Sequence, residues 1–365
     1  MISDPTMNTG WQQSLLESIP NPIIPGPLSD TARLDSAGAG DGGNAFRLTL
    51  AYPIRGVEAE YADPVRRALE RTAGIPVTLS VGFEVPDFPR TGNQPIPPGV
   101  RNLIAVASAK GGVGKSTVAA NLALGLSALG ARVGLLDADI YGPSQPAMFG
   151  VAAGVRPDSD GKRIEPLTRH GIALMSIGFL VDVNQAMIWR GPMVTQALQQ
   201  LLYQTHWPTL DYLVVDLPPG TGDIQLTLAQ RVPLSGALVV TTPQDIAVLD
   251  ARRGIRLFEK VAVPMLGVVE NMSVYRCPHC GQEAAIFGHG GGEALAQECG
   301  TLWLGSLPLV PGLCERMDQG NPPVVSEPDS DLARVFVTLA HRVAARLAQV
   351  AHEQAPGPRI IIEEG

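Results

Sequence analysis

Residues Leu103–Thr117 have the sequence LIAVASAKGGVGKST, in which a short apolar run leads into a glycine-rich segment and then into a helical pattern. Glycines let a backbone curl until its N–H groups converge on phosphate oxygens, and the dipole of the following helix adds to that attraction. In such a loop Lys115 is expected to reach the β- and γ-phosphates, and the Ser116 hydroxyl to coordinate Mg²⁺. The segment therefore predicts a phosphate-binding loop, with a glycine-rich turn that holds no ligand as the alternative.

The entrance of this loop departs from the ordinary phosphate-binding pattern. That pattern begins with a glycine, where this chain has Ala109, and the next residue is a second lysine, Lys110. The whole chain contains four lysines, and two of them bracket the loop. The expected nucleotide-binding residues along the loop are Gly111, Gly112, Val113, Gly114, Lys115, Ser116 and Thr117.

Short apolar runs alternate with helical patterns through the rest of the chain. Ser116–Leu129 and Gly222–Gln230 are two of the helical patterns, and Asp331–Glu353 carries apolar residues at helical spacing. The expected strands are Leu103–Ser108, Arg132–Leu136, Ala173–Ile177, Tyr212–Val215, Gly236–Thr241, Pro264–Glu270 and Thr301–Leu307. Apolar strands separated by helices predict an α/β fold, with a mostly parallel sheet covered by helices on both faces. Ligands bind such sheets at the carboxyl ends of the strands.

Aspartates end two of the predicted strands. Val133–Leu136 runs into Asp137-Ala-Asp139, and a turn there can bring both carboxylates towards Mg²⁺ and an attacking water. Tyr212–Asp216 is a hydrophobic strand that ends in a carboxylate, and Gly220 in the following loop can sense the γ-phosphate through its N–H. Phosphoryl transfer depends mainly on positioning and charge neutralisation, so weakly basic carboxylates suffice. The alternative for Asp137 and Asp139 is that they cap the next turn.

Two of the four cysteines are close together, as Cys277-Pro-His279-Cys280 followed by Gly281. Two thiolates at this spacing can grip one metal centre from a tight turn, but a pair is only half of a four-thiolate site. Two copies of the chain would supply enough thiolates for a [4Fe–4S] cluster or a structural zinc, and ligand softness does not choose between them. The same spacing is compatible with a redox pair and with a pair that has no metal role. A disulfide framework is implausible at this cysteine density.

Charge and hydropathy narrow the classes of partner. The formal net charge is −8, from 27 Lys and Arg against 35 Asp and Glu, so nonspecific nucleic-acid binding is not expected. No apolar run reaches the length of about 18 residues that a spanning helix needs. No basic residue precedes Arg33, so a secretory signal is not expected either. The sequence predicts a cytoplasmic protein with no membrane partner.

Residues 1–99 differ from the rest and predict a separate small domain. They contain no lysine and are interrupted by the glycine-rich stretch Ala37–Asn44. Their expected elements are helices at Trp11–Ile19 and Tyr61–Ala73 and strands at Phe46–Tyr52 and Pro76–Phe83. The predicted organisation is an α+β domain at 1–84, a proline-rich linker at 85–100, a nucleotide-binding domain at 101–353 and a tail at 354–365.

The loop sequence KGGVGKST resembles the deviant Walker A loop of the MinD/ParA-type ATPases, which have the P-loop NTPase fold. The resemblance implies a homodimer in which Lys110 reaches the nucleotide bound by the other subunit. It also implies that Asp139 orients the attacking water, with Asp137 as the second candidate for that role. Asp216 is then the Walker B carboxylate. Asn271 resembles the family's adenine-reading asparagine, with an ordinary loop cap as the alternative.

Three further features are similar to the Mrp/ApbC family of iron–sulfur cluster carriers. The CPHC pair follows Glu270–Ser273 (ENMS), Trp189–Met193 has the sequence WRGPM, and residues 1–99 resemble the MIP18-type domain of many members. The resemblance implies that ATP hydrolysis is coupled to the binding of a [4Fe–4S] cluster on the two thiols and to its transfer from a donor to apoproteins. MIP18-type domains often carry a cysteine after the central strand, whereas Ala51–Gly56 has none, so partner docking is expected there.

Three other classes of protein share parts of this pattern. A positioning or partitioning ATPase has the same nucleotide chemistry, but its membrane-binding members need a basic amphipathic end, and Arg359–Gly365 is acidic. A zinc-bridged scaffold, in which ATP only controls dimerisation, would use the same two thiols. A reductase such as nitrogenase iron protein places its cluster cysteines far apart in the chain, unlike this CPHC pair.

Overall fold

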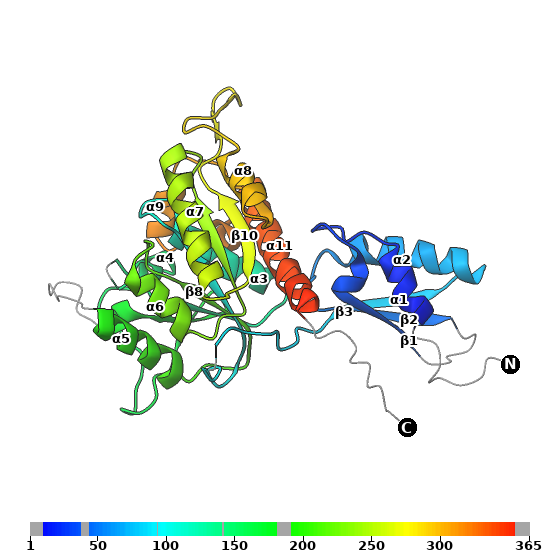
Figure 1. Ribbon diagram of the computed structural model, residues 1–365, viewed down its shortest axis with the longest axis horizontal. Helices are drawn as coiled ribbons and strands as arrows, with labels where there is room; N and C mark the ends of the chain where they lie inside the picture. Colours follow the sequence, from blue (N-terminus) through cyan, green and yellow to red (C-terminus); the bar gives the residue numbers. More distant parts are fainter. Residues whose placement is uncertain (1–9, 38–43, 93, 141, 181–190, 355–365) are drawn as a thin grey trace. The chain divides into compact units, whose positions relative to one another are not determined.

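The computed structural model describes residues 10–37, 44–92, 94–140, 142–180 and 191–354. Figure 1 shows its helices and strands. Residues 1–89 with 345–365 form one compact unit, here called the N-terminal unit, and residues 90–344 form the P-loop unit. Trp189 and Arg190 of the WRGPM stretch lie outside the described residues, as does nearly all of the predicted tail. Within the described ranges, no helix combines the length and the apolar character that crossing a membrane requires.

The N-terminal unit is a small α+β module, as the sequence predicts. Its elements are α1 (Gly10–Glu17), β1 (Ala32–Ser36), β2 (Ala45–Leu50), α2 (Glu58–Ala73) and β3 (Thr78–Phe83). Strand β2 lies in the middle of the sheet, antiparallel to β1 and parallel to β3. The sequence analysis missed only β1 among these elements, because its residues ARLDS bury Leu34 alone and give little apolar signal.

Buried polar side chains form a hydrogen-bonded group in the core of this unit. Asn21 Nδ2 donates to Thr31 Oγ1 at 3.0 Å and to the Tyr52 hydroxyl at 2.9 Å. The hydroxyls of Tyr52 and Tyr61 are 3.2 Å apart. Buried polar groups need such partners to offset their lost hydration. Ala51–Gly56, the segment after β2 that lacks a cysteine, therefore contributes Tyr52 to this buried hydrogen-bond network.

The P-loop unit is built on an eight-stranded sheet in the order β13-β10-β9-β4-β8-β5-β7-β6. Its strands are β4 (Val100–Ala107), β5 (Val133–Asp137), β6 (Leu167–Arg169), β7 (Ile172–Ser176), β8 (Leu210–Asp216), β9 (Gly236–Thr241), β10 (Met265–Glu270) and β13 (Trp303–Ser306). All neighbouring strands are parallel except β6 and β7. All seven predicted strands are present, β9 with the predicted bounds and the other six with shifted ends, and the mostly parallel sheet is confirmed.

Helices connect the strands and cover the sheet. They are α3 (Lys115–Ala128), α4 (Gln145–Met148), α5 (Gly191–Gln204), α6 (Asp223–Arg231), α7 (Asp245–Lys260), α8 (Gly291–Glu298), α9 (Leu313–Asp318), α10 (Pro323–Ser326) and α11 (Asp331–Glu353), whose residues from Ala345 on belong to the N-terminal unit. The connection β4–α3–β5 moves along the sheet in one direction and β8–α6–β9 in the other. Because parallel crossovers are right-handed, α3 and α6 lie on opposite faces. Helix α3 is almost wholly buried, and Gly125 lets Ala340 of α11 approach closely.

Much of the segment predicted as a linker is hydrogen-bonded to the P-loop unit. Both the backbone nitrogen and the hydroxyl of Thr91 donate to Leu234 O at 3.0 Å. The Tyr203 hydroxyl donates to Pro95 O at 2.9 Å. The described part of residues 90–100 is therefore attached to the body of this unit on its way into β4.

Candidate functional site

The glycine-rich loop joins β4 to α3 at the carboxyl edge of the sheet. Gly112 and Gly114 have φ angles of +79° and +82°, which favour glycine. A Cβ at Gly114 would also collide with the side-chain amide of Asn271, so this position admits no side chain. Gly111 and Gly112 are exposed while Val113 is buried. The outer turn of the loop thus presents its backbone to solvent, where the sequence predicts the phosphates.

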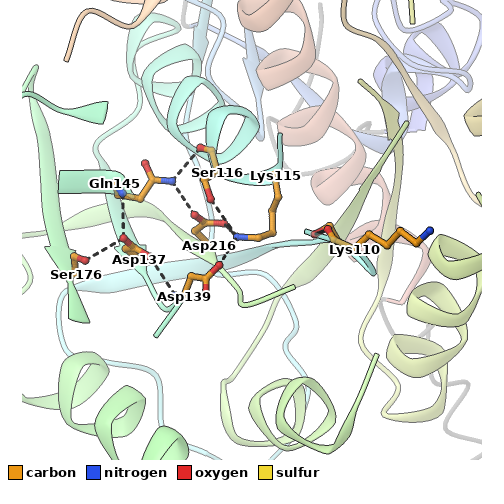
Figure 2. A network of polar contacts seen from close by, with 9 residues as sticks. Lys110, Lys115, Ser116, Asp137, Asp139, Gln145, Ser176 and Asp216 are labelled. Atoms are coloured by element: carbon orange, nitrogen blue, oxygen red, sulfur yellow. Dashed lines mark hydrogen bonds and ion pairs between the residues drawn. The ribbon is translucent and has the colours of Figure 1, made fainter. Parts of the chain in front are cut away.

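Lys115 is the first residue of α3, and oxygen atoms surround its ammonium group (Figure 2). The ammonium forms an ion pair with Asp216 and lies 3.3 Å from Ser116 Oγ and 3.7 Å from Asp139 Oδ2. Mg²⁺ prefers hydroxyl and carboxylate oxygens, and here these oxygens already converge on one cation. Ser116 and Asp216 therefore fit the Mg²⁺ ligands that the sequence predicts, and bound Mg²⁺ would supply charge neutralisation for the phosphates.

Asp137 and Asp216 end the neighbouring strands β5 and β8 and are paired in register. Asp137 is wholly buried and accepts hydrogen bonds from Asp139 N and Gln145 N, both at 3.1 Å. A third comes from the Ser176 hydroxyl at 3.0 Å. Burial, and then the charge of Asp216, raise the pKa of Asp137 to about 7. Because its hydrogen bonds go to protein groups, Asp137 organises the loop that carries Asp139.

This raised pKa predicts a pH dependence of stability that the substitution Asp137→Asn removes. An unfolded aspartate has a pKa near ~3.9, so from about pH 4 to 7 the folded protein binds a proton that the unfolded chain does not. The unfolding free energy of the ligand-free wild type should therefore fall as the pH rises. From this group alone, the loss between about pH 5 and pH 8 should be on the order of 2 kcal/mol. Urea denaturation of both proteins at the two pH values measures it, and equal pH slopes would contradict the shift.

Gln145, which the sequence analysis did not single out, lies between the two strand-end carboxylates (Figure 2). Its backbone N–H donates to Asp137, and its side-chain Nε2 donates to Asp216 Oδ2 at 2.8 Å. The same Nε2 donates to the Ser116 carbonyl at 3.0 Å. A glutamine at the start of a short helix carries no chemical signal by itself. The one sequence feature that points here is Pro146, since proline favours the first turn of a helix.

Lys110, the lysine at the loop entrance, lies away from the Lys115 cluster. Figure 2 shows its ammonium pointing away from Lys115 and Asp216. Its Nζ lies 3.4 Å from Asp250 Oδ2 on α7, and the side chain is 40% exposed. The carbonyl of Lys110 accepts a hydrogen bond from the Ser108 hydroxyl at 2.8 Å, which holds the loop entrance in place.

Two residues that the sequence predicts to contact the nucleotide form hydrogen bonds with other protein groups. The N–H of Gly220 donates to Ser108 O at 2.9 Å, so sensing a γ-phosphate requires this bond to break. Asn271 Nδ2 donates to Val113 O at 2.9 Å, and its Oδ1 accepts from Met272 N at the same distance. Asn271 therefore caps its own loop and holds the phosphate-binding loop. Adenine reading by Asn271 stays a prediction.

The cysteine pair lies on a small hairpin between β10 and α8, formed by β11 (Tyr275–Arg276) and β12 (Glu283–Ala284). Cys277 N donates to Gln282 O, and Gly281 N donates to Cys277 O, both at 2.9 Å. Gly281 has a φ of +72°, so the tight turn expected after the pair is present. Hydrogen bonds from the backbone at Cys280 and His279 lower the pKa of the Cys277 thiol. Lower pKa favours the thiolate, the form that binds metals.

The described part of the chain completes no metal site around these thiols. Among the described residues, no group of three or more His, Cys, Asp or Glu side chains could hold a metal ion. Cys299, just after α8, and Cys314, on α9, are free thiols away from the hairpin, and both have raised pKa values. Burial is the main cause for Cys299, and the charge of Asp318 is the main cause for Cys314. Cys277 and Cys280 thus remain a pair.

A family model described as ParA, NUBPL iron-transfer P-loop NTPase, matches residues 99–344. The chain belongs to this family. The iron–sulfur cluster carrier protein of Escherichia coli (strain K12) is 55% identical over 280 residues, 76% of each chain. That of Synechocystis sp. (strain ATCC 27184 / PCC 6803 / Kazusa) is 41% identical over 343 residues, 93% of this chain and 97% of the relative. The expected membership of the Mrp/ApbC carriers is confirmed.

Two solved structures share the fold of the P-loop unit. The nucleotide-binding protein from Archaeoglobus fulgidus, solved in complex with ADP, is 36% identical with a TM-score of 0.56, over 65% of this chain and 93% of that one. The cell division ATPase MinD of Pyrococcus furiosus has a TM-score of 0.50 at 22% identity, over 66% of this chain and 98% of that one. The chain thus has the P-loop NTPase fold, and its membership of a P-loop NTPase family implies ATP binding and hydrolysis.

Proposed function

We propose that this protein is an ATPase that binds a [4Fe–4S] cluster between two copies of the chain and transfers it from a donor to apoproteins in the cytoplasm. The observation that carries the proposal is the presence, in one unit, of oxygen ligands gathered around Lys115 beside the glycine-rich loop and of a hairpin with two thiols. ATP binding and hydrolysis would control the loading or release of the cluster. Neither a nucleic acid nor a membrane is a partner in this proposal.

The residues around Lys115 would perform the hydrolysis. On nucleotide binding the ammonium would exchange Asp216 for the β- and γ-phosphates, which frees the carboxylate for Mg²⁺. Asp139 Oδ2, 3.7 Å from Lys115 Nζ, is close enough to orient a water molecule beside the transferred group. Phosphoryl transfer needs little more than this positioning and charge neutralisation.

The two thiols support a second copy of the chain as the partner in cluster binding. A [4Fe–4S] cluster takes four thiolates, and the described residues of one chain bring only Cys277 and Cys280 together. Cys280 is exposed and Cys277 is half-buried, so both sulfur atoms can meet an incoming cluster. Two hairpins facing each other would complete the site and leave it open for transfer.

A face of the P-loop unit supports the same dimer. Its exposed large apolar side chains are Ile246, Leu249, Ile286 and Phe287. They come from neighbouring segments, because a Cβ at Gly288 would lie 3.9 Å from Pro243 Cβ, just before α7. Lys110 reaches this helix through its ion pair with Asp250. Exposed apolar groups that gather on one face commonly mark a protein interface. A dimer formed through this face would place Lys110 of each copy next to the other copy.

The base of the hairpin links the thiols to the nucleotide loop. Glu270, at the end of β10, accepts hydrogen bonds from Gly290 N at 3.2 Å and Gly292 N at 2.7 Å, where the hairpin segment returns. The next residue, Asn271, binds Val113 O in the phosphate-binding loop. A movement of that loop on nucleotide binding would therefore reach the start and the end of the cysteine segment.

Metal analysis after anaerobic iron–sulfur reconstitution tests the proposal. We expect about four irons and four sulfides per dimer, with Mössbauer spectra of a [4Fe–4S] cluster. One zinc per dimer without sulfide would contradict the carrier function and favour a zinc-bridged, ATP-controlled scaffold. An ATP-dependent dimer that holds neither metal would favour a MinD/ParA-like positioning switch.

A further inference from the structure

Asp137 and Asp216 pose an electrostatic problem at the carboxyl edge of the sheet. They are direct partners on neighbouring strands, and both are completely buried. Two negative charges in a buried site repel each other strongly. The carboxylates therefore rotate apart unless hydrogen-bond donors hold them in place. Lys115 contacts Asp216, but as a phosphate-binding residue it must leave when a nucleotide arrives. Some other group has to keep the Asp216 carboxylate in place at that moment.

Gln145 is suited to this task because it donates one N–H to each carboxylate. Its backbone N–H lies 3.1 Å from Asp137 Oδ2, and its side-chain Nε2 lies 2.8 Å from Asp216 Oδ2. The bond from Nε2 to Ser116 O, at 3.0 Å, ties the same amide to the first turn of α3. Asp216 Oδ2 and Ser116 O are both acceptors, so the nitrogen of the amide, and not its oxygen, must face them. The side chain is fully buried and would stay in place when Lys115 moves.

We propose that Gln145 is a positioning residue of the Mg²⁺–nucleotide site, which holds Asp216 and Ser116 in the arrangement that receives Mg²⁺. The inference rests on the ATP chemistry of the proposed function and adds a residue to it. Mg²⁺ demands near-octahedral geometry, so a small rotation of the Asp216 carboxylate weakens binding. Gln145 itself touches neither phosphate nor metal in this assignment. Its loss should therefore weaken metal binding more than nucleotide binding.

The substitution Gln145→Met tests this role, because methionine keeps the length and volume of the side chain but has no donor. Gln349→Met is the matched control, since Gln349 is a buried glutamine of the N-terminal unit whose Nε2 also donates to a backbone carbonyl, Pro25 O, at 2.7 Å. Mn²⁺ replaces Mg²⁺ as an EPR probe of the full-length protein with ADP. We expect Mn²⁺ affinity to fall by about 10-fold or more in the Gln145 variant only.

Two further measurements separate positioning from a general structural defect. The affinity for ADP in EDTA should stay close to that of the wild type, because in this assignment the amide does not contact the nucleotide. Saturating Mg²⁺ should restore most of kcat, so the defect appears in the KM for Mg²⁺. If Gln145→Met does not fold, Gln145→Leu provides the same loss of donors in a smaller side chain.

The outcomes distinguish this inference from the proposed function. Unchanged Mn²⁺ affinity in a folded Gln145 variant would overturn the positioning role. An equal loss of ADP affinity in EDTA would overturn it too, since the residue would then support the loop as a whole. If the wild type itself binds neither ADP nor Mn²⁺–ADP, the ATPase proposal fails first.

Discussion

Lys115→Ala is expected to abolish ATP turnover and, with it, the maturation of client apoproteins. The lysine ammonium is the cation that would stabilise charge on the transferred phosphate, and loss of such a group typically lowers kcat by about 100-fold or more. The fold should be retained. In the ligand-free protein the buried Asp137 can take up a proton once the ammonium is gone, because burial and the charge of Asp216 raise its pKa.

Phosphate release and transfer of a reconstituted cluster to an apoprotein measure the two effects separately. Lys162→Ala is the control, because Lys162 lies in an exposed turn of the same unit. Circular dichroism should give the same helix content for both variants and the wild type. Full client activation by a folded Lys115 variant that cannot turn over ATP would refute the coupling of hydrolysis to transfer.

The motifs of the proposed nucleotide site could be read from the sequence because each of them is local. The loop around Lys115 lies directly between its strand and its helix, and Asp216 ends an apolar strand, so each motif could be placed on its element. A parallel sheet places Asp137 and Asp216 at the same edge, but their direct pairing depends on the strand order, which the sequence analysis did not predict. Gln145 has no such signal. Its role arises only when three segments meet around one buried amide.

Other differences follow from interactions between distant segments. Strand β1 (Ala32–Ser36) has only a weak apolar pattern, because Leu34 is its one buried residue. It forms by pairing with β2. Thr91 and Pro95 look like linker residues in sequence, but acceptors and donors more than a hundred residues away attach them to the P-loop unit. The N–H of Gly220 is engaged with Ser108 for the same reason. Local patterns cannot reveal which remote backbone group completes a hydrogen bond.

Cys280→Ser is expected to remove the cluster while leaving ATP binding intact. A serine hydroxyl is a hard, mostly protonated group and replaces a soft thiolate poorly in an iron–sulfur site. In a dimer that shares one cluster, each substitution counts twice, so two of the four thiolates disappear at once. Iron and sulfide after reconstitution should therefore fall from about four each per dimer to near zero. When wild type and variant are compared free of cluster, the affinity for ADP should not change, because the phosphate-binding loop is a separate part of the unit.

Cys314→Ser is the matched control, because Cys314 is also an exposed free thiol but lies on α9 beside Asp318. It should bind the same iron and sulfide as the wild type. Retention of a full cluster by Cys280→Ser would show that other ligands hold it and that the hairpin serves another purpose. Loss of ADP binding in a folded Cys280 variant would instead mean that the thiol pair supports the nucleotide site. A shared cluster also predicts that mixing wild-type and Cys280→Ser chains yields heterodimers with three thiolates and a weakly held cluster.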